Sequence, residues 1–173
     1  MTKRALATVC LFLVTAIAFI PFAFAEDWPQ YRGPMGDGVS QESITNTNWE
    51  NNPPQVLWKT PTPLGFSSFA VADGRAFTVV ARSGDQGEKT EMCVALSADT
   101  GKQLWSVPLG ESDYGHDGGN AGAPNNQGGD GPRSTPATDG KLVFVYDSHM
   151  VLRCLNAADG ELVWKQDIIS DFD

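Results

Sequence analysis

The chain has 173 residues, of which 41% are hydrophobic and 10% aromatic, enough apolar material for one domain with a substantial core. Its 12 basic residues against 21 acidic ones give a formal net charge of −9 at pH 7. Nucleic acids and anionic membrane surfaces select for clusters of Lys and Arg, so this balance argues against either as a partner.

Residues 1–25 have the layout of a secretory signal peptide. Lys3 and Arg4 precede a long apolar run, and Ala23-Phe24-Ala25 supplies the small residues of a signal-peptidase site. The alternative is an uncleaved anchor, because about 20 apolar residues can span a bilayer. We expect cleavage, no membrane span in the mature chain, and a periplasmic or secreted protein. Lys3 and Arg4 leave with the signal, so the mature chain is more acidic still.

Residues 26–65 form a turn-rich N-terminal segment without hydrophobic periodicity. We expect Trp28 and Tyr31 to anchor it to the body of the protein, although exposed aromatic rings could also stack on a ligand. Near its end, Val56-Leu57-Trp58-Lys59 resembles the later Trp-bearing strands, so the sequence predicts a leading strand over Val56 to Thr60.

Two similar units follow, over residues 66–110 and 133–168, and an Asp-Gly pair stands near the start of each. Asp-Gly between apolar runs is a strong hairpin signal. Runs such as Leu142 to Tyr146 are apolar at consecutive positions, which indicates strands covered on both faces. The sequence therefore predicts an all-β fold, with strands over 67–72, 75–81, 91–97, 103–109, 134–138, 141–146, 151–156 and 161–168.

The strongest pattern is an internal repeat: the stretch Ala95 to Trp105 recurs as Cys154 to Trp164. Each copy leads from an apolar strand through a small-polar turn ending in Gly to a Trp. Hairpins of this kind cannot bury their own faces, so long-period repeats indicate stacked units, as in propellers and solenoids.

The motif, with Ala95, Thr100, Gly101 and Trp105 in the first copy and Gly160 and Trp164 in the second, resembles the tryptophan-docking repeat of the pyrroloquinoline-quinone-type β-propellers. That family includes quinoprotein alcohol dehydrogenases and the propeller component of the outer-membrane protein assembly machinery. The opening Asp27 to Pro34, and Gly131 to Pro136, resemble an exported bacterial subgroup.

The resemblance implies a partial β-propeller of two four-stranded antiparallel blades plus one leading strand. It also implies that the Trp rings wedge against the turn glycine of a neighbouring blade. A closed propeller needs about 4–8 blades, so we expect an N-terminal part of a longer protein whose remaining blades pack on this part, with 169–173 beginning the continuation. The alternative is that two chains assemble into a ring. The predicted structural residues are Trp58, Trp105, Trp164, Gly101 and Gly160.

After removal of the signal, which carries Cys10, two cysteines remain, Cys93 and Cys154. The aligned repeats place both on the same strand of successive units, facing the same way round the stack. Packed sheets lie about 10 Å apart, beyond the usual reach of a disulfide. The sequence therefore predicts two free, buried thiols.

Residues 111–132 form a Gly-rich loop with many oxygen-bearing side chains. Asp113, His116 and Asp117 are the candidate metal ligands or bases, although the EF-hand pattern is absent and the composition is also that of a solvated linker. The other polar residues of this loop are Tyr114, Asn120, Asn125, Asn126, Gln127 and Asp130.

Three functions remain open. We favour a non-catalytic exported scaffold without a cofactor or catalytic residues, binding other envelope proteins, because no nucleophile, base and orienting group stand together. A second interpretation is part of a quinone-dependent alcohol dehydrogenase, with pyrroloquinoline quinone held over Ca²⁺ on the propeller axis, although the vicinal Cys-Cys pair usual in that family is absent. The third is a carbohydrate- or cell-wall-binding module that stacks sugars on Trp28, Tyr31 or Tyr114.

Overall fold

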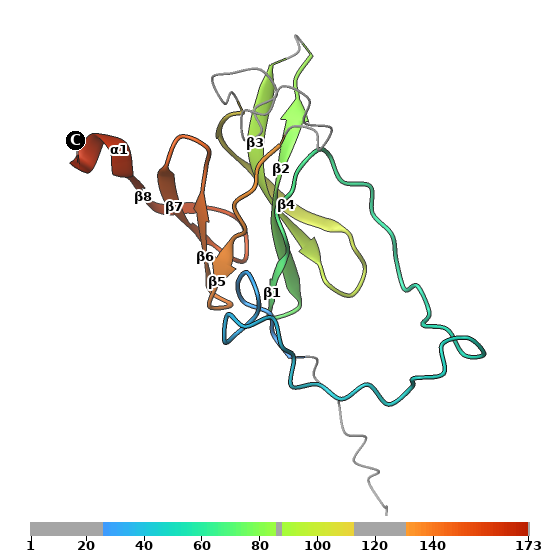
Figure 1. Cartoon of the computed structure of the whole chain (residues 1–173). Helices are drawn as coiled ribbons and strands as arrows, with labels where there is room; N and C mark the ends of the chain where they lie inside the picture. Colours follow the sequence, from blue (N-terminus) through green and yellow to red (C-terminus); the bar gives the residue numbers. More distant parts are fainter. Residues whose placement is uncertain (1–25, 86–87, 113–130, 173) are drawn as a thin grey trace, which may run out of the picture.

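Two four-stranded antiparallel sheets stand side by side in the computed structural model, which describes residues 26–85, 88–112 and 131–172 (Figure 1). The strands run in chain order in both sheets. The first sheet contains β1 (Ala70–Ala72), β2 (Arg75–Ser83), β3 (Lys89–Ser97) and β4 (Gln103–Glu111). The second contains β5 (Ala137–Thr138), β6 (Leu142–Tyr146), β7 (Val151–Asn156) and β8 (Leu162–Asp167). The predicted all-β fold with two four-stranded blades is confirmed.

The Asp-Gly hairpins join the first two strands of each sheet, as the sequence predicts. Gly74 and Gly140 have φ values of 69° and 87°, a left-handed conformation that glycine adopts without steric penalty. In the second turn, Asp139 Oδ1 accepts hydrogen bonds from the backbone N–H groups of Lys141 and Leu142. The inner strands β1 and β5 are shorter than the predicted 67–72 and 134–138.

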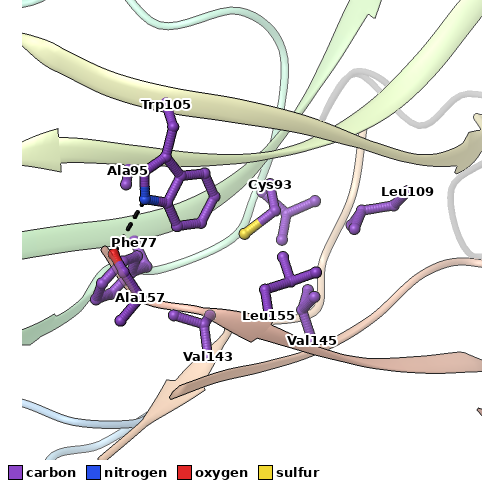
Figure 2. Packing of buried hydrophobic residues seen from close by; sticks show 10 residues of the cluster. Phe77, Cys93, Ala95, Trp105, Leu109, Val143, Val145, Leu155 and Ala157 are labelled. Carbon is purple, nitrogen blue, oxygen red and sulfur yellow. Dashed lines mark hydrogen bonds between the residues drawn. The ribbon is translucent and has the colours of Figure 1, made fainter. Parts of the chain in front are cut away.

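The main core lies between the two sheets (Figure 2). Alternate residues of β2, β3 and β4 point from the first sheet toward alternate residues of β6 and β7. We call the side of each sheet that carries its Trp the tryptophan face and the opposite side the glycine face. The core thus joins the tryptophan face of the first sheet to the glycine face of the second, through Phe77, Val79, Cys93, Ala95, Trp105, Leu109, Val143, Val145, Leu155 and Ala157.

The glycine face of the first sheet is covered by residues 58–64. Its apolar cluster consists of Val80, Val94 and Leu96, with Met92 packed against it. The prediction of a leading strand over Val56 to Thr60 is wrong, since these residues form no strand. A strand needs a hydrogen-bonded partner, and none of the described strands pairs with residues 56–60. The bridge between Leu64 and Ala81 lies after this segment.

The N-terminal segment is hydrogen-bonded to the innermost strand of each sheet and so connects the two sheets. Trp28 exchanges two backbone hydrogen bonds of 2.8 Å with Val71 in β1, and the Pro29 carbonyl accepts one of 2.8 Å from Thr138 N–H in β5. We call Trp28 and Pro29 the strap. The ring of Trp28 packs on Gly33. Tyr31 is 64% exposed, so the expectation that it also anchors the segment is wrong.

A short helix, α1 (Ile168–Phe172), follows β8. The sequence does not predict this helix. Within residues 26–85, 88–112 and 131–172, no helix has the length and apolar character needed to cross a membrane. The predicted signal peptide and nearly all of the Gly-rich loop, including Asp113, Tyr114, His116 and Asp117, lie outside the described residues.

Candidate functional site

Trp105 forms the joint between the two sheets. Its indole Nε1–H donates a 3.0 Å hydrogen bond to the Ala157 carbonyl, and its ring lies 5.8 Å from that of Phe77 (Figure 2). The turn residue Gly160 has φ of 79°, and a Cβ there would lie 2.8 Å from Trp105 Cε3 and 2.6 Å from Val107 Cγ2. The ring therefore occupies the space that any larger turn residue would need.

Trp58 makes the same joint with the first sheet. Its Nε1–H donates a 2.8 Å hydrogen bond to the Ala98 carbonyl, and Thr60 Oγ1–H donates one of 2.8 Å to the Gly101 carbonyl. A Cβ on Gly101 would lie 2.6 Å from Trp58 Cδ2. Residues 58–60 thus take the place that Trp105 and Val107 take on the second sheet.

Trp164 stands at the matching position of the second sheet, but no turn glycine of the described residues lies against its ring. Its ring lies 6.2 Å from that of Phe144, as Trp105 lies beside Phe77, yet the residue is 42% exposed. The cross-strand pairs Phe144–Cys154, Cys154–Trp164 and Tyr146–Leu152 place the remaining members on the same face. Tyr146, which the pairing places on this face, is also 37% exposed.

A buried ion pair at the turn between β6 and β7 and a hydrogen bond from this turn to the first sheet together form what we call the brace. Arg153 pairs with Asp147, and the other oxygen of Asp147 accepts 2.9 Å hydrogen bonds from the backbone N–H groups of His149 and Val151. Glu91, buried on the first sheet, accepts a 2.9 Å hydrogen bond from Ser148 N–H. Both oxygens of Asp147 are therefore engaged, which makes this carboxylate a structural group and a poor general base.

Both thiols are free and buried, as the sequence predicts. Burial raises the pKa of Cys93 to about 12. The pKa of Cys154 is also raised, by burial first and then by the negative charge of Asp139. Backbone N–H groups of Leu142 and then Lys141 lower the pKa of Asp139 itself. Since the thiolate is the reactive species, neither cysteine is suited to nucleophilic or redox chemistry in the folded state.

A calcium-bound quinone would need several oxygen ligands held close together. Among the described residues, no three His, Cys, Asp or Glu side chains come together as metal ligands. Where the inner strands β1 and β5 approach each other, the main chain of the strap is hydrogen-bonded to both, and the nearby Asp27 carboxylate accepts a hydrogen bond from Asp73 N–H. The candidate ligands Asp113, His116 and Asp117 belong to the part that the structure does not describe.

A family model described as "Outer membrane protein assembly factor BamB" matches residues 89–172, from β3 to the end of α1. The match contains both Gly-to-Trp turns. This match supports a pyrroloquinoline-quinone-type propeller repeat over residues 89–172. Among the solved structures that match is BamB from Moraxella catarrhalis, at 18% identity and a TM-score of 0.31, over 61% of this chain and 33% of that one. This chain thus spans about a third of that protein, and no curated protein matches it.

The sequence predicts the joint residues and the anchoring of the N-terminal segment by Trp28, but it predicts neither the brace nor the bond between Pro29 and Thr138. Trp105 and Gly160 come together, as do Trp58 and Gly101, whereas Trp164 has no described turn against it. Their contribution to stability remains a prediction. One feature of the sequence could have indicated the brace. Residues of a strand alternate between its two faces, and this alternation places the charged Arg153 on the face that packs on the first sheet.

Proposed function

We propose that this protein is an exported, non-catalytic propeller module that binds other envelope proteins through the tryptophan face of its second sheet. The observation that carries the proposal is the likeness between the tryptophan faces of the two sheets. The second sheet has Phe144, Cys154 and Trp164 in the same cross-strand arrangement as Phe77, Ala95 and Trp105 of the first sheet. In the first sheet, this face is covered by the second sheet.

Exposed apolar surface of this kind is suited to contact with another protein or with further blades of the same propeller, because proteins rarely leave large contiguous apolar patches in water. An aromatic anchor with a polar N–H suits such a site, since Tyr and Trp are enriched among the residues that dominate binding energy. Export and a periplasmic or secreted location are supported by the signal-like residues 1–25 and by the family model, whose description names an outer-membrane assembly factor. A cofactor is not part of this proposal.

The test places a photo-crosslinking amino acid at Tyr146, on the proposed face, or at Ile44, on the N-terminal segment. Ile44 is 68% exposed and Tyr146 37%, so chance collisions would favour the control position. We expect discrete crosslinked products in living cells from position 146 alone, weakened by Trp164→Ala. Equal labelling from both positions would contradict the proposal.

The enzymatic alternative has its own assay. Purified protein is mixed with pyrroloquinoline quinone, Ca²⁺ and an artificial electron acceptor dye, and oxidation of primary alcohols is followed. We expect no dye reduction above the quinone-only blank. Turnover that scales with protein concentration would show that the module is catalytic.

A further inference from the structure

The two Asp-Gly turns touch each other between the sheets. A Cβ added to Gly140 would lie 3.8 Å from the Asp73 Cβ, an ordinary van der Waals distance. An open groove of about 380 Å³ lies beside this contact. The first sheet contributes Asp73 and Arg75 to its lining, and the second contributes Gly140, Lys141, Leu142, Asn156 and Ala158. The groove is therefore formed by both described sheets, and none of the aromatic residues on which the proposed function depends lines it.

Two cationic side chains face this groove, one from each sheet. Arg75 lies two residues before the core residue Phe77 in β2, and Lys141 lies two residues before the core residue Val143. Because side chains two apart in extended chain share a face, both cations point toward the opposite sheet. Arg75 Nη1 donates a 2.7 Å hydrogen bond to Asp73 Oδ2, which leaves Nη2 and Nε to bind a ligand. The Lys141 ammonium forms no hydrogen bond or ion pair with the described residues.

The groove offers more hydrogen-bond donors than acceptors. Asn156 Oδ1 accepts a 2.9 Å hydrogen bond from Ala158 N–H, so the Nδ2 group of this side chain remains as a donor. Among the described residues that line the groove, Asp73 is the one acidic residue, against the cations Arg75 and Lys141. The lining thus has an excess of positive charge in a chain whose formal net charge is −9. An anionic group is the ligand that such a lining favours.

Asp139, the acidic neighbour of Lys141, is engaged by the backbone. Its Oδ1 accepts hydrogen bonds of 2.9 Å and 2.7 Å from the N–H groups of Lys141 and Leu142. These N–H groups, that of Leu142 first, also lower the pKa of Asp139, and the charge of the Lys141 ammonium contributes least. The ammonium is therefore available to a ligand.

We propose that this groove binds a peptide segment with an acidic side chain, whose carboxylate lies between Arg75 and Lys141. A guanidinium matches the planar geometry of a carboxylate, and a lysine adds a second charge without a fixed direction. The other oxygen of Asp73 is placed to accept a peptide N–H, and Leu142 and Ala158 offer apolar contact to the rest of the segment. The volume of the groove falls within the usual range for small ligands, about 300–1,000 Å³.

Amide NMR spectra of the purified protein test the proposal. The probes are the peptide acetyl-Ala-Glu-Ala-amide and the same peptide with Gln in place of Glu, which has nearly the same shape without the charge. We expect saturable shifts of the Gly140 and Lys141 signals with the Glu peptide and an affinity at least about threefold lower with the Gln peptide. Added salt should weaken binding of the Glu peptide, because partly exposed charges are screened.

Variants at Lys141 separate its charge from its shape. Lys141→Gln should bind the Glu peptide about three- to tenfold more weakly, and Lys141→Arg should retain binding. Lys165→Gln, which removes an exposed charge from β8, is the matched control and should bind as the unaltered protein does. The Lys141 side chain is exposed and lacks a partner in the described structure, so we expect these variants to fold.

Equal affinity for the Glu and Gln peptides, or the absence of shifts with either, overturns the proposal. Undiminished binding by Lys141→Gln does the same. Succinate serves as a free dicarboxylate probe, and we expect it to bind more weakly than the Glu peptide. If succinate binds as tightly, the groove recognises the anion alone and the assignment to a peptide is overturned.

Discussion

Gly160→Ala should weaken the joint between the sheets, and the structure separates two causes of that loss. At φ of 79°, a residue with a Cβ has a backbone cost of about 1–2 kcal/mol. The new methyl would also lie 2.8 Å from Trp105 Cε3 and 2.6 Å from Val107 Cγ2, closer than Cβ atoms tolerate. Overpacking of this kind costs about 1–3 kcal/mol. The lower entropy of the unfolded Ala chain offsets about 0.4–1 kcal/mol.

Gly74→Ala is the matched control, because Gly74 has a similar φ of 69° in a hairpin turn, but a methyl group added there would meet nothing within 4 Å. We expect losses in unfolding free energy of about 2–4 kcal/mol for Gly160→Ala and about 1 kcal/mol for Gly74→Ala. Urea unfolding followed by tryptophan fluorescence measures both. Equal losses would refute the idea that the indole occupies the space above the turn glycine.

Three further predictions concern the joint, the brace and the thiols. Trp105→Phe should cost about 1–2 kcal/mol in urea unfolding, since it removes a buried hydrogen bond, whereas Trp164→Phe should stay within about 0.5 kcal/mol. Arg153→Met, which leaves a buried carboxylate unpaired, should cost about 3 kcal/mol or more, and Arg75→Met, from an exposed ion pair, less than about 1 kcal/mol. The pKa of Cys93 rises from 9.0 to about 12 on folding, so its contribution to stability is complete below pH 9 and is lost as the pH rises toward 12. Unfolding midpoints at about pH 8 and pH 10.5 should show this decline, and Cys93→Ala should reduce it.

The sheets are predictable because their signals are local. Asp73-Gly74 and Asp139-Gly140 define hairpins from neighbouring residues alone, and consecutive apolar positions such as those of β6 indicate burial on both faces. The positions of Trp105 and Gly160 follow from the repeat, since similar units bury similar faces. Their actual contact needs the packing angle of the sheets, which no single stretch of sequence specifies.

The remaining features depend on partners far away in the chain. Residues 56–60 have the composition of a strand but lack a neighbouring strand, and packing of Trp58 determines their place instead. The brace joins Glu91 to Ser148 across the two sheets, with no motif at either end. Trp28 stands in the sequence as an isolated aromatic residue, and its bonds with Val71 involve only backbone groups, which leave no mark on side-chain patterns.

The strap has a consequence for the order in which this chain acquires its structure. Pro29 and its partner Thr138 lie far apart in the sequence, so their hydrogen bond closes a very large loop. Contacts of such long sequence separation form late, because the entropy of loop closure has to be met before they contribute. Trp28 can bond to Val71 as soon as β1 has formed, whereas the Pro29 carbonyl gains its donor only when β5 is in place, so the strap joins the two sheets last.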